Sequence, residues 1–286
     1  MSALPRLRES AAAMPAHDGE FAFDRADFER VRRLIHRHAG ISLHEGKRAM
    51  VYSRLVRRLR ELGHDSFERY LNQLESGPAD APEWQQFVNC LTTNLTAFFR
   101  EEHHFPLLAA ELAKRRDDKL RLWCNAASTG EEPYSLAITI AEALGPHAHR
   151  ARLLATDIDT NVLDTAARGV YDIDARGLDA ARRKRWFERG TGRQEGAMRV
   201  KPELRQLIEF RAFNLMQERW AFGEPFDIVF CRNVMIYFDE PTQRRVLERM
   251  HRALRPGGLL FAGHSENFTD AKDLFRLRGK TVYERA

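Results

Sequence analysis

The spacing of apolar positions changes near residue 117, and this change predicts two structural regions. Over residues 21 to 90 the apolar residues recur at helical intervals, with breaks at Gly40, Gly63 and Gly77, which predicts four or five short helices. Further along, short apolar runs of strand length alternate with amphipathic segments of helix length. Strands that alternate with helices pair in parallel through right-handed crossovers. We therefore expect an α/β fold with a doubly wound, mostly parallel sheet covered on both faces.

The second region divides into elements that can be placed from the sequence. After a helix over about 101–115, we expect strands and helices in this order: strand 119–124, helix 131–144, strand 152–156, helix 160–168, strand 226–231, helix 241–254, strand 258–262 and a hairpin over 274–285. Between residues 172 and 213 the alternation breaks down. Glycines there separate two short β-prone runs, 198–201 and 207–212. We interpret this stretch as a small inserted antiparallel β-subdomain.

These patterns predict the domain organisation of the chain. Residues 1–20 have no periodicity and are expected to form a loose tail. Residues 21–90 are expected to form an N-terminal all-helical domain, and residues 91–100 a linker. The remainder, residues 101–286, is expected to form the α/β domain, with the insertion at about 172–213.

Composition narrows the class of protein. The chain has 286 residues, of which 43% are hydrophobic and 30% charged, a balance typical of globular domains. No run of 18 apolar residues and no signal-peptide pattern is present in the sequence. The cysteines are odd in number and widely spaced, which favours a cytoplasmic protein without disulfides. The histidines have no metal-ligand spacing, so no bound metal is expected. The cysteines are Cys90, Cys124 and Cys231.

Positive charge is concentrated in the helical region. Residues 30–60 carry ten basic side chains and one acid, a local charge of +9. Because the whole chain has a net charge of +5, the rest of it has a net charge of −4. Val51, Leu55, Leu59 and Leu62 recur on one face of a helix. An adjacent face is cationic and is formed by Lys47, Arg54, Arg57 and Arg58. Such a face attracts nucleic acid, an anionic membrane surface or an acidic protein, or is simply solvated.

The loops that follow the first two strands predict a ligand site. In an open α/β sheet, ligands lie beyond the carboxyl ends of the strands. The first loop is rich in small residues but has only Gly130 of a dinucleotide fingerprint, and a pyrophosphate there would meet Glu131 and Glu132. Asp157 ends the second strand, where a carboxylate can bind ribose hydroxyls. A nucleoside with a positive centre, such as S-adenosylmethionine, fits better than NAD or FAD. The alternative is an α/β domain whose acids cap helices.

Five stretches carry a resemblance to a known family. In order along the chain they read TTNLTAFFR (92–100), AASTGEEPYS (126–135), ATDID (155–159), FDIVFCRNVMIYF (226–238) and LLFAGHSE (259–266). Together they resemble the bacterial chemotaxis receptor methyltransferase family, CheR, from about residue 20 to the C-terminus. The resemblance implies a Rossmann-like class I S-adenosylmethionine methyltransferase. Such an enzyme transfers methyl groups to glutamate side chains of membrane chemoreceptors for chemotactic adaptation, forming methyl esters and S-adenosylhomocysteine. It would act in the cytoplasm, recruited to receptor arrays.

The resemblance also assigns site residues. The implied cofactor contacts are Asn94, Thr96, Arg100, Glu131, Asp157, Asn214, Leu215, Arg232 and Asn233. Methyl transfer to an ionised carboxylate needs positioning more than a strong base. One orienting cation and one neutral donor suit that task, and Arg100 and Tyr237 are the residues that the resemblance places near the reacting centre.

The resemblance also implies binding partners for two surfaces. The cationic face of Lys47, Arg54, Arg57 and Arg58 would steer the acidic helical bundle of a receptor's cytoplasmic region toward the site. The insertion resembles the β-subdomain of the family, which in some members captures a receptor's C-terminal peptide as an added strand; Gly190, Gly192 and Gly196 match its glycine-rich turn. We expect no membrane insertion.

Two other functions remain open at this point. A nucleic-acid methyltransferase would use the same cofactor and a basic surface, but the stretch 232–235 lacks the Asn-Pro-Pro-aromatic arrangement of amino-group methyltransferases, so no nucleic-acid partner is expected. A non-catalytic receptor-binding adaptor could keep the fold, but a degenerate pocket would be expected to have lost Asp157 or Arg100.

Overall fold

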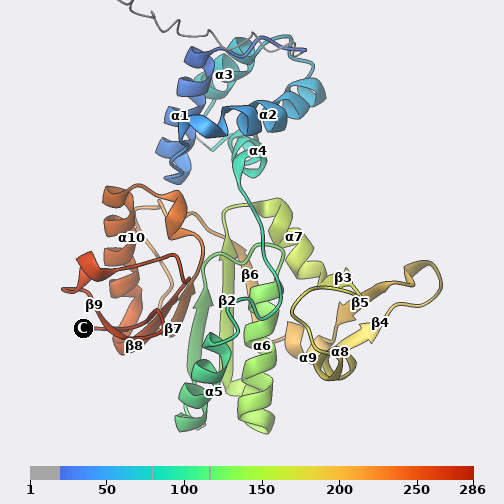
Figure 1. The fold of residues 1–286 in the computed structure, drawn as a ribbon, viewed down its shortest axis with the longest axis vertical. Coiled ribbons are helices and arrows are strands. Elements are labelled where there is room, and N and C mark those ends of the chain that lie inside the picture. Colours follow the sequence, from blue (N-terminus) through green and yellow to red (C-terminus); the bar gives the residue numbers. More distant parts are fainter. Residues whose placement is uncertain (1–19, 79, 116) are drawn as a thin grey trace, which may run out of the picture.

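The structure, a computed structural model, describes residues 20–78, 80–115 and 117–286. The tail predicted over residues 1–20 lies, except for its last residue, outside the described residues. A helical bundle sits above a larger α/β part, and a single extended segment joins the two (Figure 1). Among the described residues, no helix is long and apolar enough to cross a membrane.

Four helices form the bundle, which confirms the helical periodicity of this region. They are α1 (Arg25–Ala39), α2 (Arg48–Leu62), α3 (Phe67–Ser76) and α4 (Pro82–Leu91), with a short 3-10 turn, η1 (Glu45–Lys47), before α2. Asp24 and Asp27 form a capping box at the start of α1, and Gly40 ends that helix in the left-handed conformation with φ of 72°. The bundle has its own apolar core, to which all four helices contribute. Leu62, expected on the apolar face of α2, is instead 36% exposed in the last turn of the helix.

The α/β part contains a seven-stranded sheet in the order β6-β2-β1-β7-β8-β10-β9. Its first five strands are parallel, and the terminal hairpin adds two antiparallel ones. The strands are β1 (Leu120–Cys124), β2 (Ala151–Asp157), β6 (Ile208–Ala212), β7 (Phe226–Cys231), β8 (Leu254–Ala262), β9 (Phe275–Gly279) and β10 (Val282–Arg285). The predicted doubly wound sheet is confirmed.

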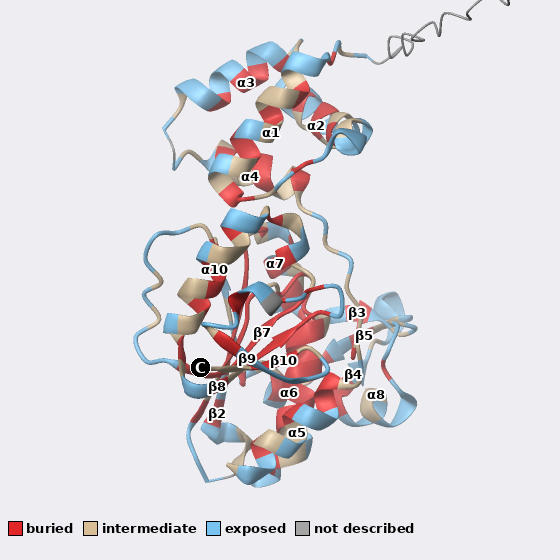
Figure 2. Cartoon of the chain, turned by 60° about the vertical axis from the view of Figure 1, so that its left-hand side comes forward, coloured by how far each residue is buried: buried red, intermediate tan, exposed pale blue. Residues whose placement is uncertain are grey.

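Helices and loops cover both faces of this sheet. Leu122 and Cys124 pack with α5 (His104–Lys114) and α6 (Glu131–Leu144), whereas Trp123 packs on the opposite face with α10 (Glu240–Ala253). Because neighbouring residues of a strand point to opposite faces, a strand that is buried throughout requires a cover on each side. The central strands β1, β2 and β7 are accordingly buried along most of their length (Figure 2).

The insertion is smaller than the sequence predicts. Its antiparallel sheet has the order β3-β5-β4, from β3 (Val170–Asp172), β4 (Phe187–Arg189) and β5 (Ala197–Val200), with α8 (Ala180–Trp186) packed alongside. The run 207–212 was wrongly included: it is the edge strand β6, which pairs in parallel with β2. The insertion, together with α9 (Pro202–Arg205), lies within the crossover from β2 through α7 (Thr160–Arg168) to β6, so it conceals the usual strand-helix-strand spacing.

Residues 92–103, between α4 and α5, form a segment without helix or strand that we call the connector. It runs down past α7 and across the sheet beside α6 (Figure 1). The insertion holds it in place: Phe98 donates its N–H to the carbonyl of Arg176 at 3.1 Å. The next residue, Gly177, has φ of 85°, and a Cβ there would lie 1.8 Å from the Phe98 carbonyl oxygen. This glycine therefore allows two backbone segments to approach more closely than any other residue would permit.

Replacing Gly177 with alanine is expected to destabilise the fold more than the same change at Gly192. Both glycines have positive φ, which costs an alanine about 1–2 kcal/mol, but nothing lies within 4 Å of a Cβ at Gly192. The contact with Phe98 adds a steric cost of roughly 1–3 kcal/mol. Urea unfolding of Gly177→Ala and Gly192→Ala measures the difference, and equal free energies of unfolding would contradict the close approach.

Candidate functional site

The carboxyl ends of the parallel strands meet at one edge of the sheet, and the connector crosses this edge. We call this region the strand-end site. The connector supplies Asn94, Thr96 and Arg100, and the start of α6 supplies Glu131. The ends of β2, β6 and β7 supply the other sequence-predicted residues: Asp157, Asn214, Leu215, Arg232, Asn233 and Tyr237. Residues that are distant in the chain, such as Asp157 and Arg232, thus come to the same edge of the sheet, as expected for parallel strands.

The loop after β1 is shaped for close backbone approach. Gly130 has φ of 101°, and a Cβ there would lie 2.5 Å from the Tyr171 hydroxyl. Only glycine therefore fits at this turn. The following residue, Glu131, is half-buried and accepts a hydrogen bond from Thr129 Oγ1 at 2.6 Å. The carboxylate of Glu131 thus lies at the N-terminus of α6, where a helix favours negative charge.

Asp157 is a buried acceptor at the end of β2. Its two carboxylate oxygens accept the N–H groups of Ser128 at 2.8 Å and Asp159 at 3.0 Å. Burial raises the pKa of Asp157 to about 6, although these two hydrogen bonds oppose the rise. A carboxylate oxygen can accept more than one hydrogen bond, so each oxygen retains capacity for a ligand hydroxyl.

The connector is anchored to the strand-end loops at several points. Asn94 donates from Nδ2 to Asp159 Oδ2 at 2.8 Å, and its carbonyl accepts from Ser128 Oγ at 3.1 Å. Phe99 donates its N–H to Ser135 Oγ at 2.9 Å. Thr96 is half-buried and has no hydrogen bond within the described part of the chain. The Asn94 amide thus holds the connector, and its predicted contact with a cofactor stays a prediction.

Asp159 is an anchoring residue that the sequence reasoning did not single out. It caps α7 by accepting from the N–H of Asn161, and it also accepts from Thr92 Oγ1 at 2.6 Å. One carboxylate therefore joins the helix, the connector and the Asn94 side chain. A helix-capping aspartate next to a strand end is visible in the sequence, but its second role depends on the tertiary structure.

Arg100 lies between two residues with unusual backbone conformations. Phe99 and Glu101 have φ of 51° and 54°, in the left-handed region that disfavours residues other than glycine. Arg100 is half-buried and donates from Nη1 to the carbonyl of Leu95 at 3.0 Å. Tyr237, in the 3-10 turn η4 (Met235–Tyr237), is half-buried, and its hydroxyl has no partner among the described residues. Backbone strain of this kind is typical of functional sites.

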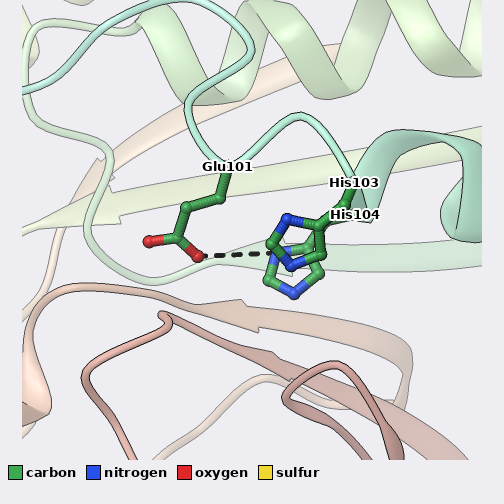
Figure 3. Close-up of side chains that lie close together, drawn as sticks. All are labelled: Glu101, His103 and His104. Atoms are coloured by element: carbon green, nitrogen blue, oxygen red, sulfur yellow. Dashed lines mark ion pairs between the residues drawn. The ribbon is translucent and has the colours of Figure 1, made fainter.

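Glu101 faces the histidines at the start of α5 (Figure 3). Burial would raise the pKa of Glu101, but hydrogen bonds from His264 and Asn233 and the charge of Arg232 outweigh it and lower the pKa to about 2. His104 is fully buried and bonds through Nε2 to the carbonyl of Lys280 at 2.9 Å. Burial lowers the pKa of His104 to about 4. At neutral pH, Glu101 is therefore ionised and His104 neutral.

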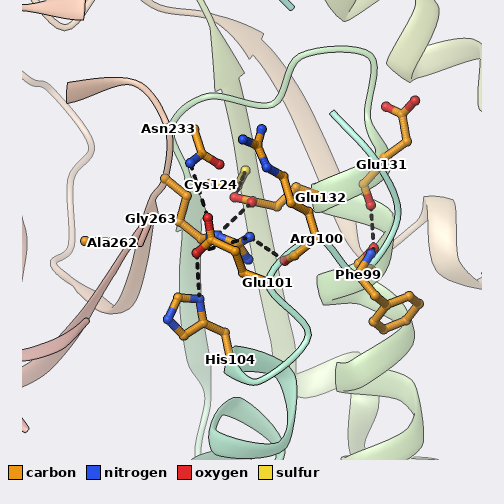
Figure 4. Close-up of polar contacts among 12 residues, drawn as sticks. Phe99, Arg100, Glu101, His104, Cys124, Glu131, Glu132, Asn233, Ala262 and Gly263 are labelled. Atoms are coloured by element: carbon orange, nitrogen blue, oxygen red, sulfur yellow. Dashed lines mark hydrogen bonds and ion pairs between the residues drawn. The ribbon is translucent and has the colours of Figure 1, made fainter. Parts of the chain in front are cut away.

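Arg232 joins the connector to the end of β7. Figure 4 shows the neighbouring residues Arg100, Glu101 and Glu132. Its side chain is fully enclosed, with Glu132 at 3.4 Å and Glu101 at 3.8 Å, and it donates to the carbonyl oxygen of Arg100. Burial raises the pKa of Glu132, against the effect of the Arg232 charge. In this structure the guanidinium contacts the protein's own acids and the connector. Its predicted contact with a cofactor therefore stays a prediction.

Glu266 shapes the loop after β7, which carries Asn233 and Tyr237. Its carboxylate accepts four backbone N–H groups at 2.6–3.0 Å, from Asn233, Val234, Met235 and Gly263. Asn233 has φ of 58° and donates from Nδ2 to Glu101 at 3.2 Å. From the sequence, this glutamate is expected only as a site-rim or structural residue four positions beyond the strand 258–262.

The residues after β6 join the site to the helical bundle. Asn214 donates from Nδ2 to the carbonyl of His38 at 2.7 Å, and Leu215 is buried in the apolar core beside α10. His36 in α1 contacts Asp239, the N-cap of α10, at 2.9 Å. The positions of Asn214 and Leu215 are therefore structural in part, and their predicted proximity to adenine is untested.

The cationic face of α2 is smaller than the sequence predicts. Lys47 and Arg57 are exposed, but Arg54 donates to the carbonyls of Leu91 and Thr92, and Arg58 pairs with Glu83 at 2.5 Å. Glu61 pairs with both Arg57 and Arg58, and Glu20, Glu29 and Glu75 pair with other arginines of the cluster. These acids lie outside the 30–60 window, so contacts that folding creates compensate part of the local charge of +9.

The glycines of the insertion lie in the turn between β4 and β5. Gly192 and Gly196 have φ of 58° and 91°. A Cβ at Gly190 would lie 2.1 Å from the Gln194 carbonyl oxygen. The turn itself thus requires these glycines, whatever the insertion binds.

Family comparisons agree with this arrangement. Residues 94–284 match the model described as CheR methyltransferase, SAM binding domain, and residues 26–92 match CheR methyltransferase, all-alpha domain. The chain belongs to the CheR methyltransferase family. This confirms the resemblance found in the sequence. The first of these matches contains the connector from Asn94 onward and every strand end of the site.

Curated relatives in the CheR family cover almost the whole chain. The chemotaxis protein methyltransferase of Klebsiella aerogenes is 53% identical over 96% of this chain and 95% of its own length. Chemotaxis protein methyltransferase 2 of Pseudomonas aeruginosa is 55% identical, over 93% and 95%. The chemotaxis protein methyltransferase of Escherichia coli is 52% identical, over 92% and 91%.

The residues at the strand ends fit S-adenosylmethionine. Asp157 offers acceptors for ribose hydroxyls, and Gly130 allows the backbone of the first loop to approach a ligand. The carboxylates of Glu131 and Asp157 suit a ligand with a positive sulfonium and no phosphate. A dinucleotide would instead bring its pyrophosphate against these acids, so the donor set supports the expected cofactor.

Asp157→Asn is expected to weaken binding of S-adenosylhomocysteine by roughly 10- to 100-fold, because hydrogen bonds to a charged group contribute about 1.5–3 kcal/mol. Since the pKa of Asp157 is about 6, the wild-type affinity should also fall as the pH is lowered from about 7.5 to about 5.5 and the carboxylate gains a proton. Calorimetric titration at both pH values measures each effect.

Asp172→Asn is the matched control, since Asp172 is an exposed aspartate in β3. It should bind S-adenosylhomocysteine like the wild type. An Asp157→Asn variant with wild-type affinity and an unchanged pH profile would remove Asp157 from the cofactor site.

Proposed function

We propose that this protein transfers the methyl group of S-adenosylmethionine to glutamate side chains of chemoreceptors and forms glutamate methyl esters. Its membership of the CheR family and the printed names of its relatives support a methyltransferase of chemotaxis. The observation that carries the finer proposal is the placement of Arg100. The connector presents this cation between two left-handed residues, at the edge where the cofactor-binding strand ends meet. A carboxylate substrate is the natural partner of such a cation.

The reaction needs positioning rather than a strong base. A glutamate side chain, with a reference pKa of about 4.3, is already ionised at neutral pH. When bound, S-adenosylmethionine supplies an electrophilic methyl group on a sulfonium. Arg100 would orient the substrate carboxylate so that one oxygen is in line with that methyl group. A single cation is enough, because a stronger countercharge would stabilise the ionised substrate more than the partly neutralised transition state.

Tyr237 would complement Arg100 as a neutral donor. Its hydroxyl has no partner among the described residues, and Glu266 fixes the loop that carries it. A neutral hydroxyl can hold one carboxylate oxygen without adding charge. This division between one cation and one neutral group is the mechanism that we propose for this chain.

Receptor recognition would involve two surfaces outside the strand-end site. Lys47 and Arg57, the exposed members of the cationic face, would steer the acidic cytoplasmic helical bundle of a receptor toward the site. The β3-β5-β4 sheet would tether the receptor's C-terminal peptide at an edge and raise the local enzyme concentration. The protein would then work in the cytoplasm, recruited to membrane receptor arrays.

Arg100→Ala is expected to lower the rate of methyl transfer to receptor fragments by at least about 100-fold, the effect of removing one preorganised charged donor. Tyr237→Phe removes only a neutral hydroxyl and should cost less, about tenfold. Radiolabelled transfer followed by mild alkali measures both, because methyl esters release volatile methanol.

Alkali-stable label on duplex DNA or RNA would favour a nucleic-acid methyltransferase, and no label on any substrate would favour an adaptor. Circular dichroism and urea unfolding of both variants should match the wild type. Wild-type turnover in Arg100→Ala would remove this residue from the mechanism.

Arg57→Glu is expected to slow receptor methylation several-fold at low salt and to leave stability unchanged, because its side chain is 82% exposed. Arg58→Glu is the matched contrast one position along. It breaks the pair with Glu83, which also accepts a hydrogen bond from Tyr70. It should therefore lower the free energy of unfolding by about 1.5–3 kcal/mol.

Methylation rates across a salt series and urea unfolding separate the two variants. Steering by exposed charge must weaken as salt rises. A methylation rate in Arg57→Glu that equals the wild-type rate at every salt concentration would exclude this part of α2 from receptor docking.

A further inference from the structure

We propose that Glu101, His103 and His104 bind one zinc ion where the connector enters α5. The sequence analysis expects no metal, but the structure brings these three residues together: one donor atom from each lies within 4.8 Å of the others. The two imidazole rings stand side by side, with centroids 4.2 Å apart, and the Glu101 carboxylate points toward them (Figure 3). The site would adjoin two predicted cofactor contacts, because Glu101 lies 3.8 Å from Arg232 and accepts a hydrogen bond from Asn233.

The hydrogen bonds of His104 determine which of its nitrogens carries the proton. Nε2 lies 2.9 Å from the carbonyl oxygen of Lys280 and 3.1 Å from Thr281 Oγ1. A carbonyl can only accept, and the Thr281 hydroxyl already donates to the carbonyl of Ala262 at 2.8 Å. Nε2 must therefore carry the hydrogen. An imidazole that carries its hydrogen on Nε2 has a lone pair on Nδ1.

That lone pair has no partner inside the protein. His104 Nδ1 is buried and without a hydrogen bond, and its side chain has no exposed surface. It faces Glu101 Oε2 at 3.8 Å, beyond hydrogen-bond distance. An imidazole lone pair and a carboxylate oxygen are both acceptors, so their direct contact without a proton or a cation between them is unfavourable. A metal ion between them would satisfy both.

Two carboxylates and one buried cation lie around this point. Glu101 and Glu132 both face Arg232. Arg232 Nη2 lies 3.8 Å from Glu101 Oε2 and donates to the carbonyl of Arg100, and Nε lies 3.4 Å from Glu132. Glu101 accepts hydrogen bonds from His264 and Asn233, and each carboxylate oxygen can accept more than one. The Glu101 carboxylate therefore retains acceptor capacity for an ion.

The donor set selects zinc. Two imidazole nitrogens and one carboxylate oxygen, with a fourth position for water, form a typical open zinc site. Magnesium and calcium prefer oxygen donors alone. Zinc bonds of about 2.0–2.1 Å place tetrahedral ligands roughly 3.3 Å apart, so Glu101 and His104 need to approach by only about half an ångström. His103, which is half-buried, can reach the ion by rotating its side chain.

The experiment titrates the metal-free full-length protein with Zn²⁺ in a calorimeter, and with Co²⁺ as a spectroscopic probe of coordination. We expect one ion per chain and the visible absorption of tetrahedral Co²⁺. His103→Gln removes a half-exposed ligand without disturbing the core, and it should weaken binding at least about tenfold. Glu101→Gln should do the same.

The control is His147→Gln combined with His149→Gln. These histidines lie in the 3-10 turn η2 (Gly145–Arg150), outside the proposed site, and the double variant should bind Zn²⁺ like the wild type. No bound ion, wild-type affinity in both His103→Gln and Glu101→Gln, or loss of binding only in the control would each overturn the proposal. His104→Gln is a second variant, whose fold is verified by circular dichroism before titration.

Discussion

The buried guanidinium of Arg232 is the constraint on which the strand-end site depends. A cation without solvent access must be surrounded by acids and acceptors, because an unpaired buried charge costs several kcal/mol. Here Glu132 and Glu101 supply the acids, and the carbonyl of Arg100 supplies the acceptor. Glu101 and the Arg100 carbonyl belong to the connector. The contacts that neutralise Arg232 at the end of β7 therefore also fix the connector backbone on both sides of Arg100.

The strained backbone around Arg100 follows from this anchoring. Left-handed conformations at Phe99 and Glu101 are unfavourable in isolation, so surrounding contacts must hold them. Ser135 holds the N–H of Phe99, and His264 and Asn233 hold the side chain of Glu101. The side chain of Arg100 is left at the edge where the proposed substrate and cofactor would meet. A rigid presentation of this kind is what a reaction governed by positioning requires.

The same loops carry the helical bundle. Asp159 joins α7 to the connector, Asn214 contacts the end of α1, and Asp239 pairs with His36. Each of these residues follows or precedes a strand of the sheet, so the site and the bundle share their supports. A receptor that docks on the bundle would therefore bind to a body whose position relative to the strand ends is defined. The proposed docking surface on the bundle and the proposed reaction site at the strand ends would thus be held in a defined relative position by these shared contacts.

The sequence by itself determined the helices, the parallel sheet and the strand ends that form the site, because these depend on local periodicity and on a general rule for α/β sheets. The sequence also showed the resemblance to the family, through stretches that include residues 92–100 of the connector and the loops after β1, β2, β7 and β8. The tertiary structure decided the rest. It placed β6 in the main sheet, paired Arg58 with Glu83, enclosed Arg232 and brought the Lys280 carbonyl to His104. Each of these outcomes joins residues that are distant in the chain, and local pattern contains no information about such contacts because burial and pairing arise only when the elements pack.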